Sequence, residues 1–359
     1  MLIPKPLCYN FPMLNTTLLD QRIDHLLQPG VVDMHFDLLL DLYDKRGQPN
    51  VLVDDFVPDW QAGNMGVLGV AIYLEDKYLP ELALRVALDQ VARLYAEVDQ
   101  SSHFAVVKSH ADMVAARQAG KIALLITMEG VEPLGADIDM LRVFYELGMR
   151  SLGLTHARRN LAGDGGVFAP SGSSPAGLSG FGKQLVRESE RLGIMLDLAH
   201  LNPAGVDDVL SLTGRPVIIS HSNPRHYHDI ERNSSDAHIR EVGRRGGVIG
   251  VNAVLVSANP EKATIDHYVD HIAYIAGMAG IDSVGIGFDF MEFIYNRWTP
   301  AEQAALNTAL TRPCFVPNLG NHSHTRHLAQ RLLERGFSDA ETAKVLYGNW
   351  MRVFAQLLS

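Results

Sequence analysis

Eight short apolar segments, mostly separated by stretches of helical periodicity, constrain the fold of this 359-residue chain more than any other feature. Near-continuous apolar runs of strand length are typical of parallel strands buried on both faces. The segments cover residues 31–37, 66–73, 122–129, 151–156, 194–200, 216–221, 247–254 and 283–290. Because eight parallel strands close a (β/α)8 barrel, the pattern predicts a TIM barrel of the α/β class. An open, doubly wound sheet is the alternative.

The stretches between these segments predict helices and two insertions. Apolar residues recur at three- and four-residue spacing in 84–98, 181–193 and 270–280. Asn-Pro at 202–203 and Thr-Pro at 299–300 predict capped helix starts with proline in the first position. Residues 74–121 and 158–179 exceed what a barrel needs, and the second stretch is a Gly-, Ser- and Pro-rich loop. We therefore expect one barrel domain with insertions over residues 1–359.

Charge and cysteine content argue against some classes of partner. The formal net charge is −10, from 41 acidic and 31 basic residues, so we expect no nucleic-acid surface. Cys8 and Cys314 form no C-x-x-C pair, which is consistent with a reducing compartment. The N-terminal stretch does not resemble a signal peptide, and no run approaches the roughly 18 apolar residues of a membrane span. We expect a cytoplasmic protein.

The first predicted strand carries polar side chains that need partners. Asp33, His35 and Asp37 alternate within the apolar run VVDMHFDLLL. Residues i, i+2 and i+4 of a strand share a face. Burying such groups unpaired costs about 2–7 kcal/mol each, so neighbours satisfy them or they are ligands. We interpret Asp33 as a residue that orients a neighbour.

Polar residues also close most of the other predicted strands. A barrel brings the carboxyl ends of its strands to one mouth, where active sites lie. The residues are His35, Asp37, Glu129, His156, His200, His221 and Asp289. Imidazole and carboxylate suit Zn²⁺ and related divalent ions, and this many ligands suit two metals that share a carboxylate. A single histidine at a strand end is more often a hydrogen-bonded loop residue, so the joint pattern supports the metal hypothesis.

Several longer motifs resemble the membrane dipeptidase (renal dipeptidase) family of zinc peptidases, within the amidohydrolase-type metal-dependent barrels. The resemblance runs from roughly Val31 to Phe354 and keeps the family's order and spacing. The motifs are DMHFD (33–37), MEG (128–130), LTH (154–156), the block 177–200 ending in LDLAH, VIISHSNPR (217–225), ERN (231–233), VGIGFDF (284–290) and GNWMRVF (348–354). The long block and the GNWMRVF ending are the specific ones.

The resemblance implies a binuclear zinc dipeptidase that hydrolyses dipeptides, with L-Xaa-D-Xaa as one candidate class, through a metal-bridging hydroxide. It implies that His35 and Asp37 bind one zinc and that His200 and His221 bind the other. Glu129 would bridge both ions. Ligands of these types accept Zn²⁺, Co²⁺ and Mn²⁺ alike. A homodimer is also implied.

The same resemblance implies three residues that act on the substrate. His156 would lie over the scissile carbonyl, Arg232 would hold the substrate's carboxylate, and Asp289 would transfer protons. From the residues alone, Asp289 also fits an ordinary loop carboxylate that caps a helix. Arg232 likewise fits a surface salt bridge with Glu231 or Asp236.

Three departures from the family pattern concern the substrate. The usual G-G-D-[FY]-D-G reads GFDFME at 287–292, and VNAV stands at 251–254, where many relatives place a tyrosine. Arg158 and Arg159 add positive charge after His156. We therefore expect preserved hydrolytic machinery and an altered pocket, for an unusual dipeptide or a small amide with an acidic group. An amidohydrolase or tailoring enzyme for another small amide is the alternative, and a non-catalytic metal-stabilised barrel is a third interpretation.

Overall fold

The computed structural model describes residues 16–168, 176–309 and 311–358. The N-terminal stretch with Cys8 and part of the predicted loop 158–179 lie outside these residues. The strands are β1 (Val31–Phe36), β2 (Met65–Ile72), β3 (Phe104–Val106), β4 (Ile122–Glu129), β5 (Ser151–Gly153), β6 (Met195–Asp197), β7 (Ile218–Ser222), β8 (Val248–Val251) and β9 (Val284–Ile286).

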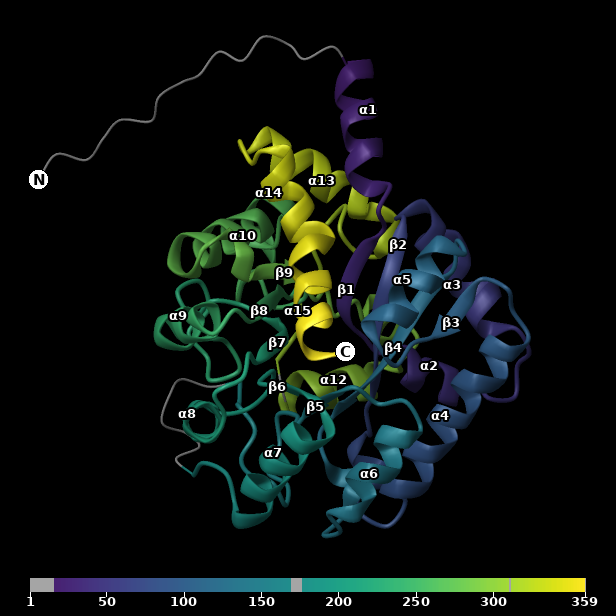
Figure 1. The fold of residues 1–359 in the computed structure, drawn as a ribbon, viewed down its shortest axis with the longest axis vertical. Coiled ribbons are helices and arrows are strands. Elements are labelled where there is room, and N and C mark those ends of the chain that lie inside the picture. The colour runs from purple at the N-terminus through teal and green to yellow at the C-terminus, as the bar shows by residue number, and fades with distance from the viewer. Residues whose placement is uncertain (1–15, 169–175, 310, 359) are drawn as a thin grey trace, which may run out of the picture.

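The α-helices lie between and after these strands (Figure 1). They are α1 (Thr16–Leu27), α2 (Leu38–Asp44), α3 (Val51–Ala62), α4 (Ala83–Asp99), α5 (His110–Gln118), α6 (Asp139–Glu146), α7 (Gly180–Leu192), α8 (Pro203–Leu212), α9 (Asp236–Arg244), α10 (Ile265–Ala279), α11 (Glu292–Tyr295), α12 (Pro300–Ala309), α13 (Thr325–Glu334), α14 (Asp339–Ala343) and α15 (Asn349–Leu357). Helices α4, α7 and α10 confirm the helices predicted from apolar periodicity, and α8 and α12 confirm those predicted to begin with proline. Among the described residues, no helix is both long and apolar enough to cross a bilayer.

Eight of the described strands close a parallel barrel. Each of β1, β2 and β4 to β9 pairs with the next of this set, and β9 pairs with β1 between Ile286 and Asp33. This closed ring confirms the (β/α)8 TIM barrel and excludes the open sheet. Strand β3 lies within the predicted insertion 74–121 and was not predicted; it extends the sheet beside the first residues of β4.

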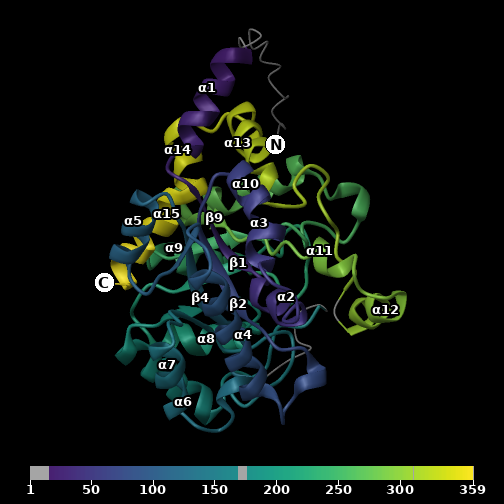
Figure 2. The same cartoon turned by 90° about the vertical axis from the view of Figure 1, so that its right-hand side faces the viewer.

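Helix α15 plugs one end of the barrel. Trp350 and Phe354 share a buried cluster with barrel residues that include Val32, Met34 and Val248. The indole Nε1–H of Trp350 also donates to the carbonyl of Ile286 at 2.9 Å. The GNWMRVF motif therefore has a structural role: its helix closes this end of the barrel. Figure 2 shows α5 and α15 at one end of the barrel and α11 and α12 at the opposite end.

Candidate active site

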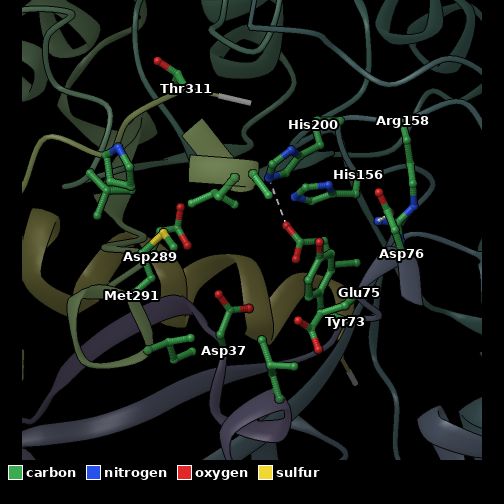
Figure 3. A pocket seen from close by; sticks show the side chains of 18 of the residues that line it. Asp37, Tyr73, Glu75, Asp76, His156, Arg158, His200, Asp289, Met291 and Thr311 are labelled. Atoms are coloured by element: carbon green, nitrogen blue, oxygen red, sulfur yellow. Dashed lines mark hydrogen bonds and ion pairs between the residues drawn. The ribbon is translucent and has the colours of Figure 1, made fainter. Parts of the chain in front are cut away.

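The strand-end residues predicted as ligands and catalytic groups meet at the barrel mouth opposite α15 (Figure 3). His35 lies in β1, Asp37 directly after it, Glu129 at the end of β4, and His221 in β7. His156, His200 and Asp289 lie three residues beyond the last residue of β5, β6 and β9, respectively. Several of these side chains form ion-pair contacts with one another. Each of those is at most 15% exposed, although it lies at the mouth of the barrel.

Glu129 is the carboxylate that belongs to two of the three groups of potential ligands, and His35 and His221 also belong to two groups each. Oε1 of Glu129 lies 3.0 Å from His200 Nε2 and 3.4 Å from His221 Nε2. The same oxygen lies 3.9 Å from His35 Nε2, which is 3.7 Å from Asp37 Oδ1. The donor atoms of Glu129, His200 and His221 all lie within 4.8 Å of one another, as do those of His35, Asp37 and Glu129. Their members are the residues to which the family resemblance assigns the two ions.

This donor set fits divalent cations. The two Nε2 atoms of His200 and His221 approach each other to 2.9 Å. Asp37 Oδ1 is buried and has no hydrogen-bond partner in the described part of the chain. Leaving a buried carboxylate oxygen unpaired is costly, and a cation among these atoms removes that cost. Nitrogen and carboxylate oxygen are ligands that Zn²⁺ takes in proteins.

Burial and neighbouring charges set the protonation of the ligand side chains. Burial lowers the pKa of both His200 and His221 well below the ordinary histidine value, so each ring is neutral and has a lone pair to share. Burial by itself raises the pKa of Glu129, but the adjacent histidines, His35 first among them, lower it well below its usual range. His200 and His221 are therefore neutral imidazoles beside an ionised carboxylate. His35 differs from them: against the effect of burial, its carboxylate neighbours, Glu129 first among them, raise its pKa to about 10.

Asp289 is held in a fixed orientation at the mouth. Asn252 Nδ2 donates a hydrogen bond to Asp289 Oδ2 at 2.7 Å. The backbone of Asp289 has φ of +59°, a strained conformation of the kind found at functional sites. Burial raises the pKa of this carboxyl to about 7, against the opposing effect of His35. A carboxyl group with this pKa both accepts and releases protons near neutral pH.

His156 lies beside the ligand cluster. Its ring stacks on His200 with 4.3 Å between centroids, and the ring of Tyr73 lies 4.8 Å away on a tilted plane. Burial lowers the pKa of His156 well below the ordinary value, so the ring is neutral. A neutral imidazole still carries one N–H that donates a hydrogen bond.

Arg232 is buried rather than at the surface, with 3% of the residue exposed. Its Nη2 donates to the carbonyl of His221 at 2.9 Å. Nε and Nη1 have no hydrogen-bond partner among the described residues. The charge of Arg232 acts on Asp289 and Glu129, although Arg232 is not among the described residues that line the cavity at the mouth.

Two aspartates that do not belong to the ligand groups tie the strand ends together. Asp33 Oδ1 accepts the backbone N–H of His35 at 3.2 Å and that of Phe288 at 2.9 Å. Asp197 Oδ1 accepts the N–H of Ala199 at 3.0 Å and that of Ser220 at 2.9 Å. Asp33 thus orients a neighbour, as its position in the sequence indicated. Neither Asp197 nor Asn252 was identified from the sequence as a supporting residue. Asp197 is the aspartate of the LDLAH motif, so a signal for it was present in the sequence.

A cavity of about 450 Å³ opens over these residues. Figure 3 shows Met291 and Thr311 on one side of it and Arg158, Asp76, Glu75 and Tyr73 on the other.

The positive charge expected from the two arginines after His156 is paired locally. Arg158 donates to Glu132 at 2.6 Å and to Asp76 at 2.9 Å, and Arg159 donates to Asp164 at 2.8 Å. Arg158 and Arg159 therefore give no separate reason to expect an additional acidic group on the substrate.

Known proteins resemble the chain in both sequence and fold. It is 29% identical over 276 residues to dipeptidase tcpJ of Claviceps purpurea, an alignment that covers 75% of this chain and 58% of that protein. The crystal structure of dipeptidase AC, a metallopeptidase, superposes with a TM-score of 0.80 at 25% identity, covering 92% of this chain and 98% of that one.

A metallopeptidase of Rhodobacter sphaeroides, liganded with a phosphinate mimic of the dipeptide L-Ala-D-Ala, gives a TM-score of 0.80 at 24% identity, over 92% of this chain and 99% of that one. The family model of membrane dipeptidase (peptidase family M19) matches residues 21–358. With its barrel, its ligand groups around Glu129 and this match, the chain belongs to the membrane dipeptidase family.

Proposed function

We propose that this chain is a dipeptidase that uses two zinc ions to hydrolyse the peptide bond of dipeptides. The observation that carries the proposal is the membership of Glu129 in two ligand groups, one with His200 and His221 and one with His35 and Asp37. A carboxylate shared in this way suits a pair of cations. Membership of a dipeptidase family supports the reaction type.

In this proposal His35 and Asp37 would hold one ion and His200 and His221 the other, and Glu129, which belongs to both ligand groups, would be shared. Bound divalent cations of this kind supply a hydroxide near neutral pH and polarise a carbonyl group. Zinc is proposed because of the mixed nitrogen and carboxylate donors, which Co²⁺ and Mn²⁺ also accept.

Three further residues of the chain act on the substrate. The neutral ring of His156 donates a hydrogen bond to the carbonyl oxygen as negative charge develops on it. Asp289 accepts a proton on the attacking side and passes it to the leaving amine. Arg232 binds the substrate's carboxylate through its unpaired Nε and Nη1, because a guanidinium fork matches a carboxylate. Dipeptides of the L-Xaa-D-Xaa type are included, since the Rhodobacter peptidase binds a mimic of one.

The test is the zinc content and dipeptide hydrolysis of the purified full-length chain, freed of chelator. We expect about two zinc ions per chain, falling sharply in Glu129→Ala. Glu146→Ala, which removes an exposed carboxylate at the end of α6, is the matched control and should keep both ions. Full hydrolytic activity in both His200→Ala and Asp289→Asn would refute the proposal. Metal binding without turnover of any dipeptide would favour another small amide as the substrate.

A further inference from the structure

The cavity over the ligand cluster has one wall built mainly from apolar side chains. This apolar wall consists of Val254, Leu255, Met291, Ile294, Trp298 and Leu306. Its residues come from the loop after β8 and from the segment that contains α11 and α12. Glu302 of α12 also lines the cavity, and its carboxylate accepts hydrogen bonds from Thr299. The same cavity is lined by Asp37, Glu129 and Asp289, so a substrate at the ligand cluster lies next to this wall.

The opposite wall is charged, but its charges pair with one another. Arg158 donates to Glu132 and Asp76, and also to the carbonyl of Leu74 at 2.8 Å. Lys77 Nζ lies 2.6 Å from Glu75. A substrate side chain on this side meets groups that already have partners, so the charged wall gives little reason to select a charged side chain.

The apolar wall is held in place from behind. Gln303 of α12 donates to the carbonyl of Tyr295 of α11 at 2.8 Å, and the Tyr295 hydroxyl lies 3.1 Å from Asn307 Nδ2. Trp298 and Leu306 line the cavity and are each only partly buried, whereas Val254, Leu255 and Ile294 are 4%, 6% and 1% exposed. The accessible apolar surface of the wall therefore belongs mainly to Met291, Trp298 and Leu306.

We propose that the apolar wall receives a large apolar side chain of the substrate, so that the preferred dipeptides carry a side chain of leucine, methionine or phenylalanine size. This inference rests on the proposed dipeptidase function and names its substrate class. Burying such a side chain favours binding by roughly ten- to hundredfold relative to glycine. The cavity volume of about 450 Å³ lies within the range of sites that enclose small ligands.

Steady-state hydrolysis by the zinc-loaded full chain tests the proposal. Two series are measured, Ala-Xaa and Xaa-Ala, in which Xaa is glycine, alanine, leucine or phenylalanine, with both configurations at the second residue. We expect one series to show kcat/KM at least about tenfold higher for leucine and phenylalanine than for glycine. In Trp298→Ala and Leu306→Ala this ratio should shrink. Leu161→Ala is the control. Leu161 is 54% exposed and does not line the cavity, so this variant should leave the ratio unchanged.

Flat profiles in both series, or a ratio that survives in both wall variants, would overturn the apolar-wall proposal while leaving the dipeptidase function intact. Absence of hydrolysis throughout would overturn the dipeptidase function instead. In that case binding of N-acetylphenylalanine amide and N-acetylglycine amide, followed by tryptophan fluorescence, tests the wall without catalysis. Binding of the phenylalanine compound alone, weakened in Leu306→Ala, supports the wall, and equal or absent binding of both compounds overturns it.

Discussion

His322 Nε2 lies 2.8 Å from Asp33 Oδ2, and this contact joins β1 to a helical turn 289 residues later in the chain. Trp60 Nε1–H donates to Nδ1 of the same imidazole at 3.1 Å. Because an indole nitrogen only donates, Nδ1 of His322 accepts and Nε2 carries the proton toward Asp33. The other oxygen of Asp33 holds the backbone N–H groups of His35 and Phe288. A buried tryptophan is thereby connected to two strand ends of the candidate active site.

Replacing His322 with phenylalanine should destabilise the protein. The substitution His322→Phe leaves Asp33 Oδ2 and Trp60 Nε1 buried without this partner, which costs about 1–3 kcal/mol in the free energy of unfolding. Urea denaturation measures the change. His327→Phe, the same substitution at an exposed residue of α13, should stay within about 0.5 kcal/mol of the parent. Equal effects of the two substitutions would contradict the role of the Asp33–His322 contact.

Removing the amide of Asn252 should slow catalysis without weakening substrate binding. Asn252→Ala releases Asp289 from its 2.7 Å hydrogen bond, and we expect kcat to fall roughly 10- to 100-fold with little change in KM. Asn252 Oδ1 also accepts the N–H groups of Val254 and Leu255. Asn252→Asp keeps an acceptor for those groups and replaces the donor with a carboxyl oxygen that repels Asp289, so it disturbs Asp289 without collapse of the loop. A normal kcat in Asn252→Asp would exclude the orienting role.

Substituting Asp289 should distinguish proton transfer from metal binding. Its Oδ1 lies 3.7 Å from His35 Nε2, and it forms a third potential ligand group with His35 and His221. If Asp289 transfers protons, Asp289→Asn keeps the zinc content of the parent while kcat falls by roughly 10²- to 10⁴-fold. Elemental analysis of the purified variant beside its steady-state kinetics makes the distinction. Loss of one zinc ion would instead identify Asp289 as a ligand.

Removing the buried charge of Arg232 should weaken substrate binding but not the fold. Arg232→Met should raise KM for dipeptides with a free carboxylate by roughly ten- to hundredfold, the effect of a lost charged hydrogen bond. Dipeptide amides, which lack that carboxylate, should show little change. The free energy of unfolding should change little, since Arg232 forms no salt bridge within the described part of the chain and its removal relieves the cost of a buried cation. Equal KM changes for acids and amides would place the carboxylate elsewhere.

The barrel was predictable because its signals are local. Each apolar run by itself predicts one strand, and eight parallel strands separated by helices are typical of a closed barrel. Four strands, β5, β6, β8 and β9, end at least three residues earlier than predicted. In β5, β6 and β9 the chain leaves the ladder before the polar end residue. His200 and Asp289 adopt positive φ there, which turns their side chains into the mouth. Strand β3 was missed because three residues carry too little periodic signal.

The residues that support the site were harder to predict than the ligands. Ligands recur at strand ends, where one geometric rule places them together. His322 and Asn252 act through contacts with residues far away in the chain, and no spacing in the sequence marks such a pair. The burial of Arg232 follows from the packing of the loop after β7 against Gly166 and Val167, which is equally a long-range effect.

A histidine outside the active site should make stability depend on pH. His271 of α10 is fully buried, and its Nε2 lies 2.9 Å from the carbonyl of Val256. Burial lowers the pKa of His271 from 6.5 to about 3, assisted by the charge of His267 and opposed by that of Asp270. Between these two values the unfolded chain binds a proton at this residue that the folded chain does not. The contribution of His271 to stability is therefore complete above pH 6.5 and is lost as the pH falls toward 3.

His271→Gln should remove this dependence, because glutamine keeps an N–H donor and does not titrate. The difference in unfolding free energy between parent and variant should change by up to about 1.4 kcal/mol per pH unit near pH 5, the slope for one proton. The other histidines titrate in both proteins and cancel in that difference. Urea denaturation at pH 4.5, 5.5 and 6.5 gives the slope, and pH 7.5 to 8.5 is the internal control, where the difference should stay constant. A difference that is also constant across the acidic range would show that His271 takes up its proton in the folded chain, and so is not shielded by burial.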